Sequence, residues 1–224
     1  MRTRILVSLA FVAGAVRADF TIVQKVEGVG NAGEMTIRLK GNQVRADLAP
    51  QVSTITDLAS GDVITLQHAS KVFIRLPGDQ ARALLERVNE QQEATSAERP
   101  ELVATGRKEK VGKRACEVFR WSAGEIRATD WIAKDFPNLD TLVPALERFQ
   151  NAGLAGAARA LQPSLSTLPG MLIKRELTIG GQKTTTTLVS VSEAPIDAAL
   201  FVVPEPYKEA PAPLCQFPSQ VPVK

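Results

Sequence analysis

The stretch MTIRLKGNQVRADL, residues 35–48, decides the fold class of this chain. Every second side chain is apolar before the turn at Gly41-Asn42, and the alternation resumes after it. The apolar members are Met35, Ile37, Leu39, Val44, Ala46 and Leu48. A period of two places such side chains on one face of a sheet, and a short turn containing glycine joins antiparallel strands. The stretch therefore predicts a hairpin with one face packed against the core and the other exposed to solvent.

The same alternation continues on both sides of this hairpin. Further strands are expected at residues 20–26, 54–58, 63–67, 71–76, 102–106, 114–122, 125–133, 171–179, 183–192 and 201–203. Ser60-Gly61-Asp62 and Gly180-Gly181 suit hairpin turns, and Gly112 marks a turn between two of the later strands. Six strands linked by short turns before residue 77 indicate an antiparallel meander.

Two segments follow the helical period instead. The first follows Asp79, a candidate N-cap, and carries Ala81, Leu84, Leu85 and Val88 at the spacing of an amphipathic helix. The second covers residues 138–162, where Leu142, Leu146, Phe149 and Leu154 fall near one face and Gly153 and Gly156 interrupt it. A cap at Asp140 or Thr141 would place Pro144 in the tolerated first turn.

These helices lie between blocks of strands and do not alternate with single strands, which excludes a parallel doubly wound fold. The predicted class is α+β: a large curved antiparallel β-sheet, an unclosed β-barrel of about 11 strands, with two helical segments covering its concave face. A sheet of this length must twist, and twist curls it toward a barrel. We find no internal repeat.

The first residues have the pattern of a secretory signal peptide. Arg2 and Arg4 precede an apolar run from Ile5 to Val16, and small or β-branched residues lead to Ala18. The run is shorter than the roughly 20 residues of a membrane span, so we expect cleavage after Ala18. A buried N-terminal strand or helix is the alternative. The residue directly after Ala18 is Asp19 and not the cysteine that a bacterial lipoprotein needs there, so we expect a soluble periplasmic or secreted protein without a lipid anchor.

Removal of residues 1–18 would change the charge of the protein. The chain has 27 Lys and Arg residues against 24 Asp and Glu residues and a pI near 9.0. Three arginines would leave with the signal peptide, and the two signs would then balance. Composition therefore gives no support to nucleic-acid binding, and no later segment reaches the length of a transmembrane helix. We expect a domain at residues 19–208 and a proline-rich tail at residues 209–224.

The two cysteines, Cys116 and Cys215, are predicted to form a disulfide bond, because an exported chain meets an oxidising compartment. The bond would tie the tail to the strand that carries Cys116. The alternative is two unpaired thiols, with Cys116 a small core residue.

Signals of catalysis are weak. His68 is the only histidine, which excludes any site with two of them, and its place at a strand end is typical of a solvent-accessible turn residue. The chain has no Gly-x-Ser-x-Gly elbow and no glycine-rich phosphate loop. A metal site would need carboxylates alone, and turn chemistry accounts for Asp57 and Asp62. We therefore predict no metal, no cofactor and no enzymatic activity.

Four motifs carry a resemblance to a known family. They are TGRKEKVG (105–112) leading into CEVF (116–119), WIAKDFP (131–137), LPGMLIK (168–174) and FVVPEPY (201–207). Across residues 19–208 the chain resembles an exported bacterial domain of unknown function that is similar to the outer-membrane lipoprotein carriers LolA and LolB. The resemblance implies an unclosed barrel with a helical lid and a cavity for an apolar ligand. Unlike the carriers, the mature part begins directly with a strand.

The leading hypothesis is a non-catalytic extracytoplasmic protein that binds a lipid or another apolar ligand. Candidate cavity residues come from the strands and both helical segments: Phe119, Trp121, Trp131, Leu84, Leu85, Val88, Leu142, Leu146 and Phe149. Ordinary core packing is the alternative explanation of the two tryptophans. The competing hypothesis is a structural or protein-interaction module of the cell envelope that docks through a sheet edge or through the tail. A hydrolase comes third, because no nucleophile and base stand at a recognisable spacing.

Overall fold

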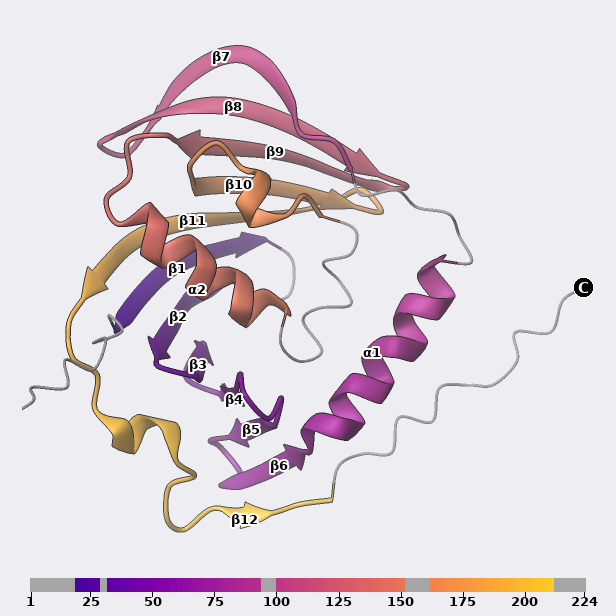
Figure 1. Ribbon diagram of the computed structural model, residues 1–224, viewed down its shortest axis with the longest axis vertical. Coiled ribbons are helices and arrows are strands. Elements are labelled where there is room, and N and C mark those ends of the chain that lie inside the picture. Colours follow the sequence, from indigo (N-terminus) through magenta and orange to yellow (C-terminus); the bar gives the residue numbers. More distant parts are fainter. Residues whose placement is uncertain (1–18, 29–31, 94–99, 152–161, 212–224) are drawn as a thin grey trace, which may run out of the picture.

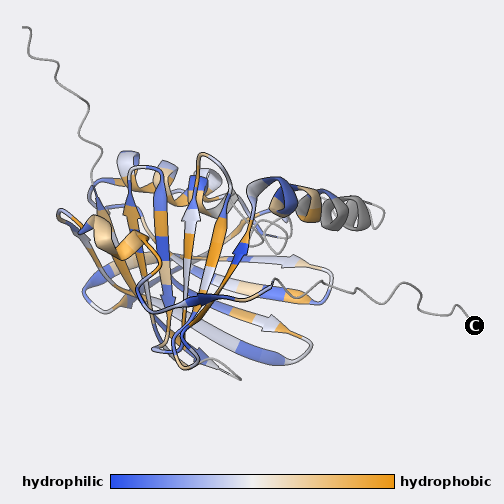
Figure 2. Ribbon diagram, turned by 90° about the horizontal axis from the view of Figure 1, so that it is seen from below, coloured by the Kyte–Doolittle hydropathy of each residue, from blue (hydrophilic) through white to orange (hydrophobic). Residues whose placement is uncertain are grey.

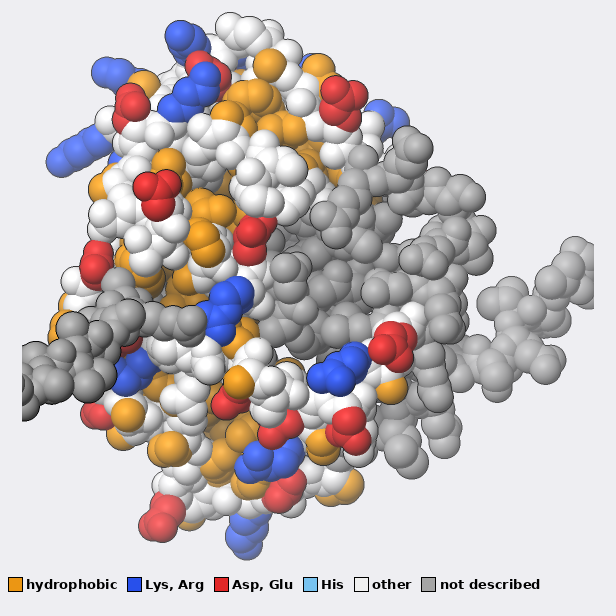
Figure 3. All heavy atoms as spheres, in the orientation of Figure 1, with side chains coloured by type: hydrophobic (Ala, Val, Ile, Leu, Met, Phe, Trp, Pro, Cys, Tyr) orange, Lys and Arg blue, Asp and Glu red, His pale blue; other side chains and the backbone are white. Residues whose placement is uncertain are grey.

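A curved sheet of twelve strands forms the framework of the molecule (Figure 1). The computed structural model describes residues 19–28, 32–93, 100–151 and 162–211. The predicted signal peptide, Leu154 and Cys215 therefore lie outside the described residues. Hydrophobic and hydrophilic residues alternate along the strand ribbons in Figure 2, as the period of two predicts. On the face seen in Figure 3, hydrophobic side chains lie among scattered charged ones.

Two antiparallel meanders make up most of the sheet. The strands of the first are β1 (Phe20–Gly28), β2 (Gly33–Lys40), β3 (Gln43–Leu48), β4 (Val52–Asp57), β5 (Val63–Gln67) and β6 (Val72–Leu76). Those of the second are β7 (Val103–Val111), β8 (Arg114–Ala123), β9 (Ile126–Ala133), β10 (Met171–Ile179) and β11 (Gln182–Glu193). Strand β1 pairs with β11 and joins the two meanders into one sheet.

Two helices accompany the sheet. Helix α1 (Gly78–Glu93) follows β6 and lies at the open side of the curve, and α2 (Leu139–Asn151) lies inside it (Figure 1). A short 3-10 helix, η2 (Leu165–Thr167), lies between α2 and β10. This arrangement confirms the predicted α+β class. None of the described helices is long and apolar enough to span a bilayer.

The main core lies between α2 and the sheet. Leu142 is 0% exposed and Leu146 is 9% exposed, and they belong to one buried cluster with Phe20, Ile22 and other residues of the sheet. The direct pairs Phe20–Leu39 and Ile22–Ile37 put these apolar side chains on one face of β1 and β2. Truncating a buried leucine such as Leu142 to alanine costs about 2–5 kcal/mol, because a cavity is left behind.

A second, smaller core lies on the other face of β4–β6. It is closed by residues 194–211, which we call the strap, a segment that includes the 3-10 helix η3 (Ala198–Phe201) and the strand β12 (Lys208–Glu209). Ile196 and Phe201 of the strap are buried together with Ile55 and Leu66. Strand β12 pairs with β6 in parallel, so the strap runs along the outside of the curve back to the edge of the sheet (Figure 1).

Two of the predicted strands, at residues 201–203 and 102–106, differ from those in the structure. The strand expected at residues 201–203 is absent: Phe201 is the last residue of η3, and Val202 is its C-cap. The Asp197 carboxylate accepts a hydrogen bond from the Ala199 amide at 2.9 Å and caps the start of η3. Strand β7 does not end at Gly106. It continues to Val111 past a register shift between Ala104 and Lys108, which Gly106 accommodates with a φ of +74°.

The two helix starts also differ. Helix α1 begins at Gly78, so Asp79 lies in its first turn and is not the N-cap; the Gly78 amide instead donates to Asp62 Oδ1 at 2.8 Å. Helix α2 begins at Leu139, whose predecessor Asn138 has a φ of +58°. Pro144 therefore lies inside the helix and not in its first turn.

Candidate functional site

An open pocket of about 260 Å³ lies between α2 and the concave face of the sheet. Phe20, Leu39 and Leu58 form its sheet side, and Pro144 and Ala145 form its helix side. Asp140, Thr141 and Arg148 supply the polar part of the lining. An apolar pocket with a few polar groups is the usual form of a small-molecule site, although sites for drug-sized ligands begin at about 300 Å³.

Polar contacts hold α2 and the segment that follows it. Glu147 Oε1 accepts hydrogen bonds from Ser164 Oγ at 2.9 Å and from the Ser166 amide at 2.6 Å. The hydrogen bonds from Ser166 and Ser164 hold the pKa of Glu147 below its usual value. Arg148 Nη2 donates to Asn42 Oδ1 at 2.7 Å, next to the pocket. The helix is thus fastened to η2 on one side and to the β2–β3 turn on the other.

A buried ion pair lies deeper in the sheet. Arg175 on β10 donates to both oxygens of Asp130 on β9, at 2.7 Å each, and Asp130 is 0% exposed. Trp121 Nε1 donates to the same carboxylate at 2.9 Å. Arg175 Nη1 also donates to Gln162 Oε1 at 2.6 Å. Gln162 belongs to the connection between α2 and β10, so this ion pair ties that connection to the sheet.

A polar cluster around His68 fastens the strap. His68 Nε2 lies 2.7 Å from Ser53 Oγ, and His68 Nδ1 lies 2.6 Å from the Tyr207 hydroxyl. Both ring nitrogens therefore have a partner, and His68 lies half-buried in the turn that follows β5. Arg45 adds a second attachment, because its Nη1 donates to the Leu200 carbonyl at 2.8 Å.

The proton on Ser53 decides what this cluster can do. Ser53 Oγ donates its one proton to Asp47 Oδ1 at 2.5 Å, so His68 Nε2 must donate to Ser53. His68 Nδ1 then accepts from Tyr207. A serine nucleophile needs a base that takes its proton, whereas this histidine gives one, and Ser53 is only 1% exposed. The geometry is that of a structural network.

Burial raises the pKa of Asp47, but hydrogen bonds from Ser53 and Arg45 outweigh this effect and hold the pKa below its usual value. The carboxylate of Asp47 is therefore an acceptor at neutral pH, as the network requires. Within the ranges that the structure describes, no group of three or more His, Cys, Asp or Glu residues could hold a metal ion.

Residues 21–207 match the family model described as "Domain of unknown function (DUF4412)". The chain belongs to this family. The predicted membership of a domain family of unknown function is thereby confirmed. A search of curated proteins found no match to this DUF4412 chain.

Several solved structures are similar to the DUF4412 chain at low identity. PNGF-II is 10% identical with a TM-score of 0.39; the match covers 87% of this chain, which spans about a third (31%) of PNGF-II. LprF from Mycobacterium bovis is 11% identical with a TM-score of 0.34, covering 85% of this chain and 90% of LprF. The LolA superfamily protein NE2245 from Nitrosomonas europaea is 11% identical with a TM-score of 0.27, covering 84% and 91% of the two chains.

The structure of the DUF4412 chain separates the two predicted cavity tryptophans. Trp121 pairs directly with Ala128 and Trp131 with Val118, and the β8–β9 ladder has no register shift between them. The two indoles therefore lie on opposite faces of the sheet. Trp131 Nε1 donates to Glu109 Oε2 at 2.7 Å, so each indole N–H has a carboxylate partner.

The other predicted cavity residues divide into three groups. Leu142 and Leu146 are buried and Phe149 half-buried beside the main core, so they hold α2 down next to the pocket. Phe119, 8% exposed, pairs with Asp130 across β8 and β9. Leu84 is half-buried on α1, and the side chains of Leu85 and Val88 lie outside the described part of the chain.

Sequence reasoning missed Asp130 and Arg175, which lie 45 positions apart. One signal was present: Asp130 falls on the same strand parity as Ala128 and Ile132, in a run that is otherwise largely apolar. A charged residue on a packed face needs a partner, but only the register of β9 and β10 identifies which residue that is.

Proposed function

We propose that this protein is a non-catalytic, extracytoplasmic binding protein for a lipid or another apolar ligand, which it holds between α2 and the concave face of the sheet. The observation that carries the proposal is the pocket of about 260 Å³ between Phe20, Leu39 and Leu58 on one side and Pro144 and Ala145 on the other. Its apolar walls lie inside the curve of a sheet that does not close.

The polar part of the pocket supports an amphipathic ligand, with an apolar chain and a polar or anionic end. Arg148 lines the pocket together with Asp140 and Thr141, whereas Phe20 and Leu39 are almost fully buried. An apolar chain would bury its surface against the aromatic and aliphatic walls, at about 25 cal/mol per Å² of apolar area. A polar or anionic end would stay near the Arg148 guanidinium, at the solvent side.

The extracytoplasmic part of the proposal rests on residues 1–18, which have the regions of a signal peptide. Expression of the full chain in a bacterial host, followed by fractionation and N-terminal sequencing, tests it. We expect a mature protein that begins at Asp19 and is released with the soluble extracytoplasmic fraction. A retained N-terminal methionine in the cytoplasmic fraction would contradict this part alone.

Native mass spectrometry after gentle purification tests the ligand. We expect a lipid-sized adduct on the wild type and saturable binding of the apolar dye N-phenylnaphthylamine. Ala145→Trp fills the pocket and should abolish both signals. Ala83→Trp, at an exposed position of α1, is the matched control and should keep them. A wild type that retains no lipid and binds no dye would overturn the proposal.

The competing hypothesis, an interaction module, meets an obstacle at the sheet edge. Strand β7 is the terminal strand of the sheet, but its register shift and its charged residues 107–110 hinder the addition of another strand. Deleting residues 212–224 tests docking through the tail. The deletion begins after residue 211 because Ala210 belongs to the strap, where its amide donates to the Phe73 carbonyl at 2.8 Å. A tail-docking protein would lose its partner, and a lipid-binding protein would keep its ligand.

A further inference from the structure

A second pocket, of about 620 Å³, lies over β7–β11. It shares no described lining residue with the pocket beneath α2. Its volume falls within the range of roughly 300–1,000 Å³ that is typical of small-molecule sites. Val103, Trp121 and Ala128 give it an apolar part, and its remaining lining residues are charged or carry a hydroxyl group.

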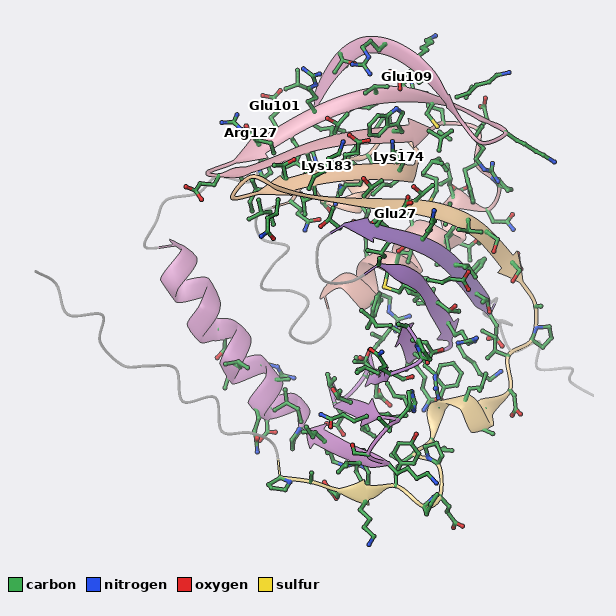
Figure 4. The ribbon with its side chains drawn as sticks, turned by 180° about the vertical axis from the view of Figure 1, so that it is seen from behind. Glu27, Glu101, Glu109, Arg127, Lys174 and Lys183 are labelled. Carbon is green, nitrogen blue, oxygen red and sulfur yellow. The ribbon has the colours of Figure 1, made fainter. Side chains whose placement is uncertain are left out.

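The strand register builds this pocket from two rows of side chains. Arg120, Thr129 and Glu176 pair in turn across β8, β9 and β10. Ser122 pairs with Arg127, and Thr178 pairs with both Arg127 and Lys183. Directly paired residues project from the same face, so both rows lie side by side on one face of the sheet. Figure 4 shows this side of the molecule, with Arg127 and Glu101 at one end and Lys183 nearby.

Most cations on this face already have a carboxylate partner. Lys174 and Lys183 each contact Glu176 at 2.7 Å, and Lys25 contacts Glu27 at 2.7 Å. The hydrogen bonds from Lys174 and Lys183 hold the pKa of Glu176 below its usual value. At neutral pH this carboxylate is therefore negatively charged, and the two lysines balance its charge.

Arg120 and Arg127 differ from those cations. Both are exposed and line the pocket, and neither guanidinium group forms a hydrogen bond or an ion pair with another described residue. Glu101 is the one further carboxylate among the described lining residues. Two arginines thus line the pocket with this one further carboxylate, and Ser122, Thr129 and Thr178 are their direct neighbours in the strand register. The pocket therefore has spare positive charge and spare hydrogen-bond donors.

We propose that this pocket binds a phosphate group, held by Arg120 and Arg127 and by the neighbouring hydroxyls. The guanidinium fork matches a phosphate in two parallel hydrogen bonds, and hydroxyls donate to the remaining oxygens. The phosphate is either that of a soluble phosphoester or that of a phospholipid headgroup. The proposal goes beyond the apolar site and does not depend on it, because the two pockets have different described linings.

Two binding experiments test the proposal. One is a calorimetric titration of the protein with inorganic phosphate, and the other is co-sedimentation of the protein with phosphatidylglycerol vesicles. The variant is Arg120→Gln/Arg127→Gln. The matched control is Lys110→Gln/Lys113→Gln, which removes the same charge from exposed positions that do not line the pocket. Circular dichroism and urea midpoints establish that both variants are folded.

We expect one probe to bind the wild type and the lysine control saturably, and the arginine variant to lose about tenfold or more in affinity for it. Binding of free phosphate identifies a soluble phosphoester, and binding of vesicles alone identifies a headgroup. No saturable binding of either probe, or equal loss in both variants, would overturn the proposal. Ala145→Trp should leave this binding unchanged, which separates it from the apolar site.

Discussion

Arg175 on β10 clasps Asp130 on β9 with two parallel hydrogen bonds of 2.7 Å, and the Asp130 side chain is wholly removed from solvent. The attraction between two buried charges adds little net stability, because both had to be taken out of water. Removing one of the two is nevertheless strongly destabilising, because the other charge stays buried. An Asp130 carboxylate left without Arg175 would be 0% exposed, with the Trp121 indole N–H as its remaining side-chain donor and no opposite charge beside it.

Arg175→Met should therefore lower the free energy of unfolding by about 3–5 kcal/mol, because it strands the Asp130 carboxylate. The double variant Arg175→Met/Asp130→Leu should recover much of this loss, since it removes both charges together. Urea denaturation of the two variants and of Asp130→Leu completes the cycle. Additive effects of the two single changes would contradict the coupling.

The Asp47 network predicts a loss of stability in acid. Because the folded state holds the pKa of Asp47 below its usual value, this carboxylate stabilises the fold above the unfolded pKa of about 3.9. The contribution is lost as the pH falls from there through the folded pKa. Asp47→Asn should cost about 1.5–3 kcal/mol at neutral pH and flatten the decline in acid.

Urea midpoints of the wild type and of Asp47→Asn, measured at intervals from pH 6 to pH 3, check this prediction. The difference between the two proteins should narrow toward the acid end. A difference that stays constant over the whole series would mean that Asp47 contributes no proton linkage.

Tyr207→Phe tests the attachment of the strap. The change keeps the ring and removes the hydroxyl that donates to His68 Nδ1 at 2.6 Å. We expect a loss of about 1 kcal/mol of stability. Hydrogen exchange should increase first at Ala210, whose amide bonds to the Phe73 carbonyl in the edge pairing of β12 with β6. Unchanged protection at Ala210 would show that the hydrophobic contacts of the strap suffice.

The Cys116–Cys215 bond stays a prediction, because Cys215 lies outside the described residues. Cys116 on β8 is buried, and burial raises the pKa of its thiol, so it should react only on unfolding. Thiol titration of the denatured, non-reduced protein should find no free thiol if the bond forms. Two free thiols per chain would contradict it.

The structure adds a second measurement to that experiment. Strand β12 lies at the β6 edge, whereas β8 lies next to the opposite edge. Three residues separate Pro211 from Cys215, and extended chain spans at most about 3.6 Å per residue. If the bond forms within one chain, oxidation should weaken the β12–β6 pairing and raise hydrogen exchange at Ala210.

The sequence predicted most of the sheet because its strands carry a local signal. In β2 and β3 each alternate residue is apolar, and Gly41 at the turn has a φ of +57°, the left-handed conformation that glycine adopts without strain. At residues 201–203 the local signal misleads, because this apolar run begins at the last residue of a 3-10 helix that Asp197 caps.

The candidate sites depended on information that the sequence does not display locally. The opposite faces of Trp121 and Trp131 follow from strand parity and were accessible in principle. The two pockets were not, because each combines residues from several strands whose pairing spans most of the chain. In the sequence, Arg120 and Arg127 look like ordinary surface residues. Only the strand register shows that they lie on the same face of the sheet and line one pocket.

The pairing of β1 with β11 has a consequence for the order of events in folding. Phe20 pairs with Glu193, so the first described strand waits for a partner that lies 173 positions later in the chain. Until then β1 presents an open row of backbone groups, and closure of such a large loop is slow because most of the chain must be ordered at once. A nascent chain that stops short of residue 182 should therefore remain a substrate for holding chaperones, even though its first meander is complete.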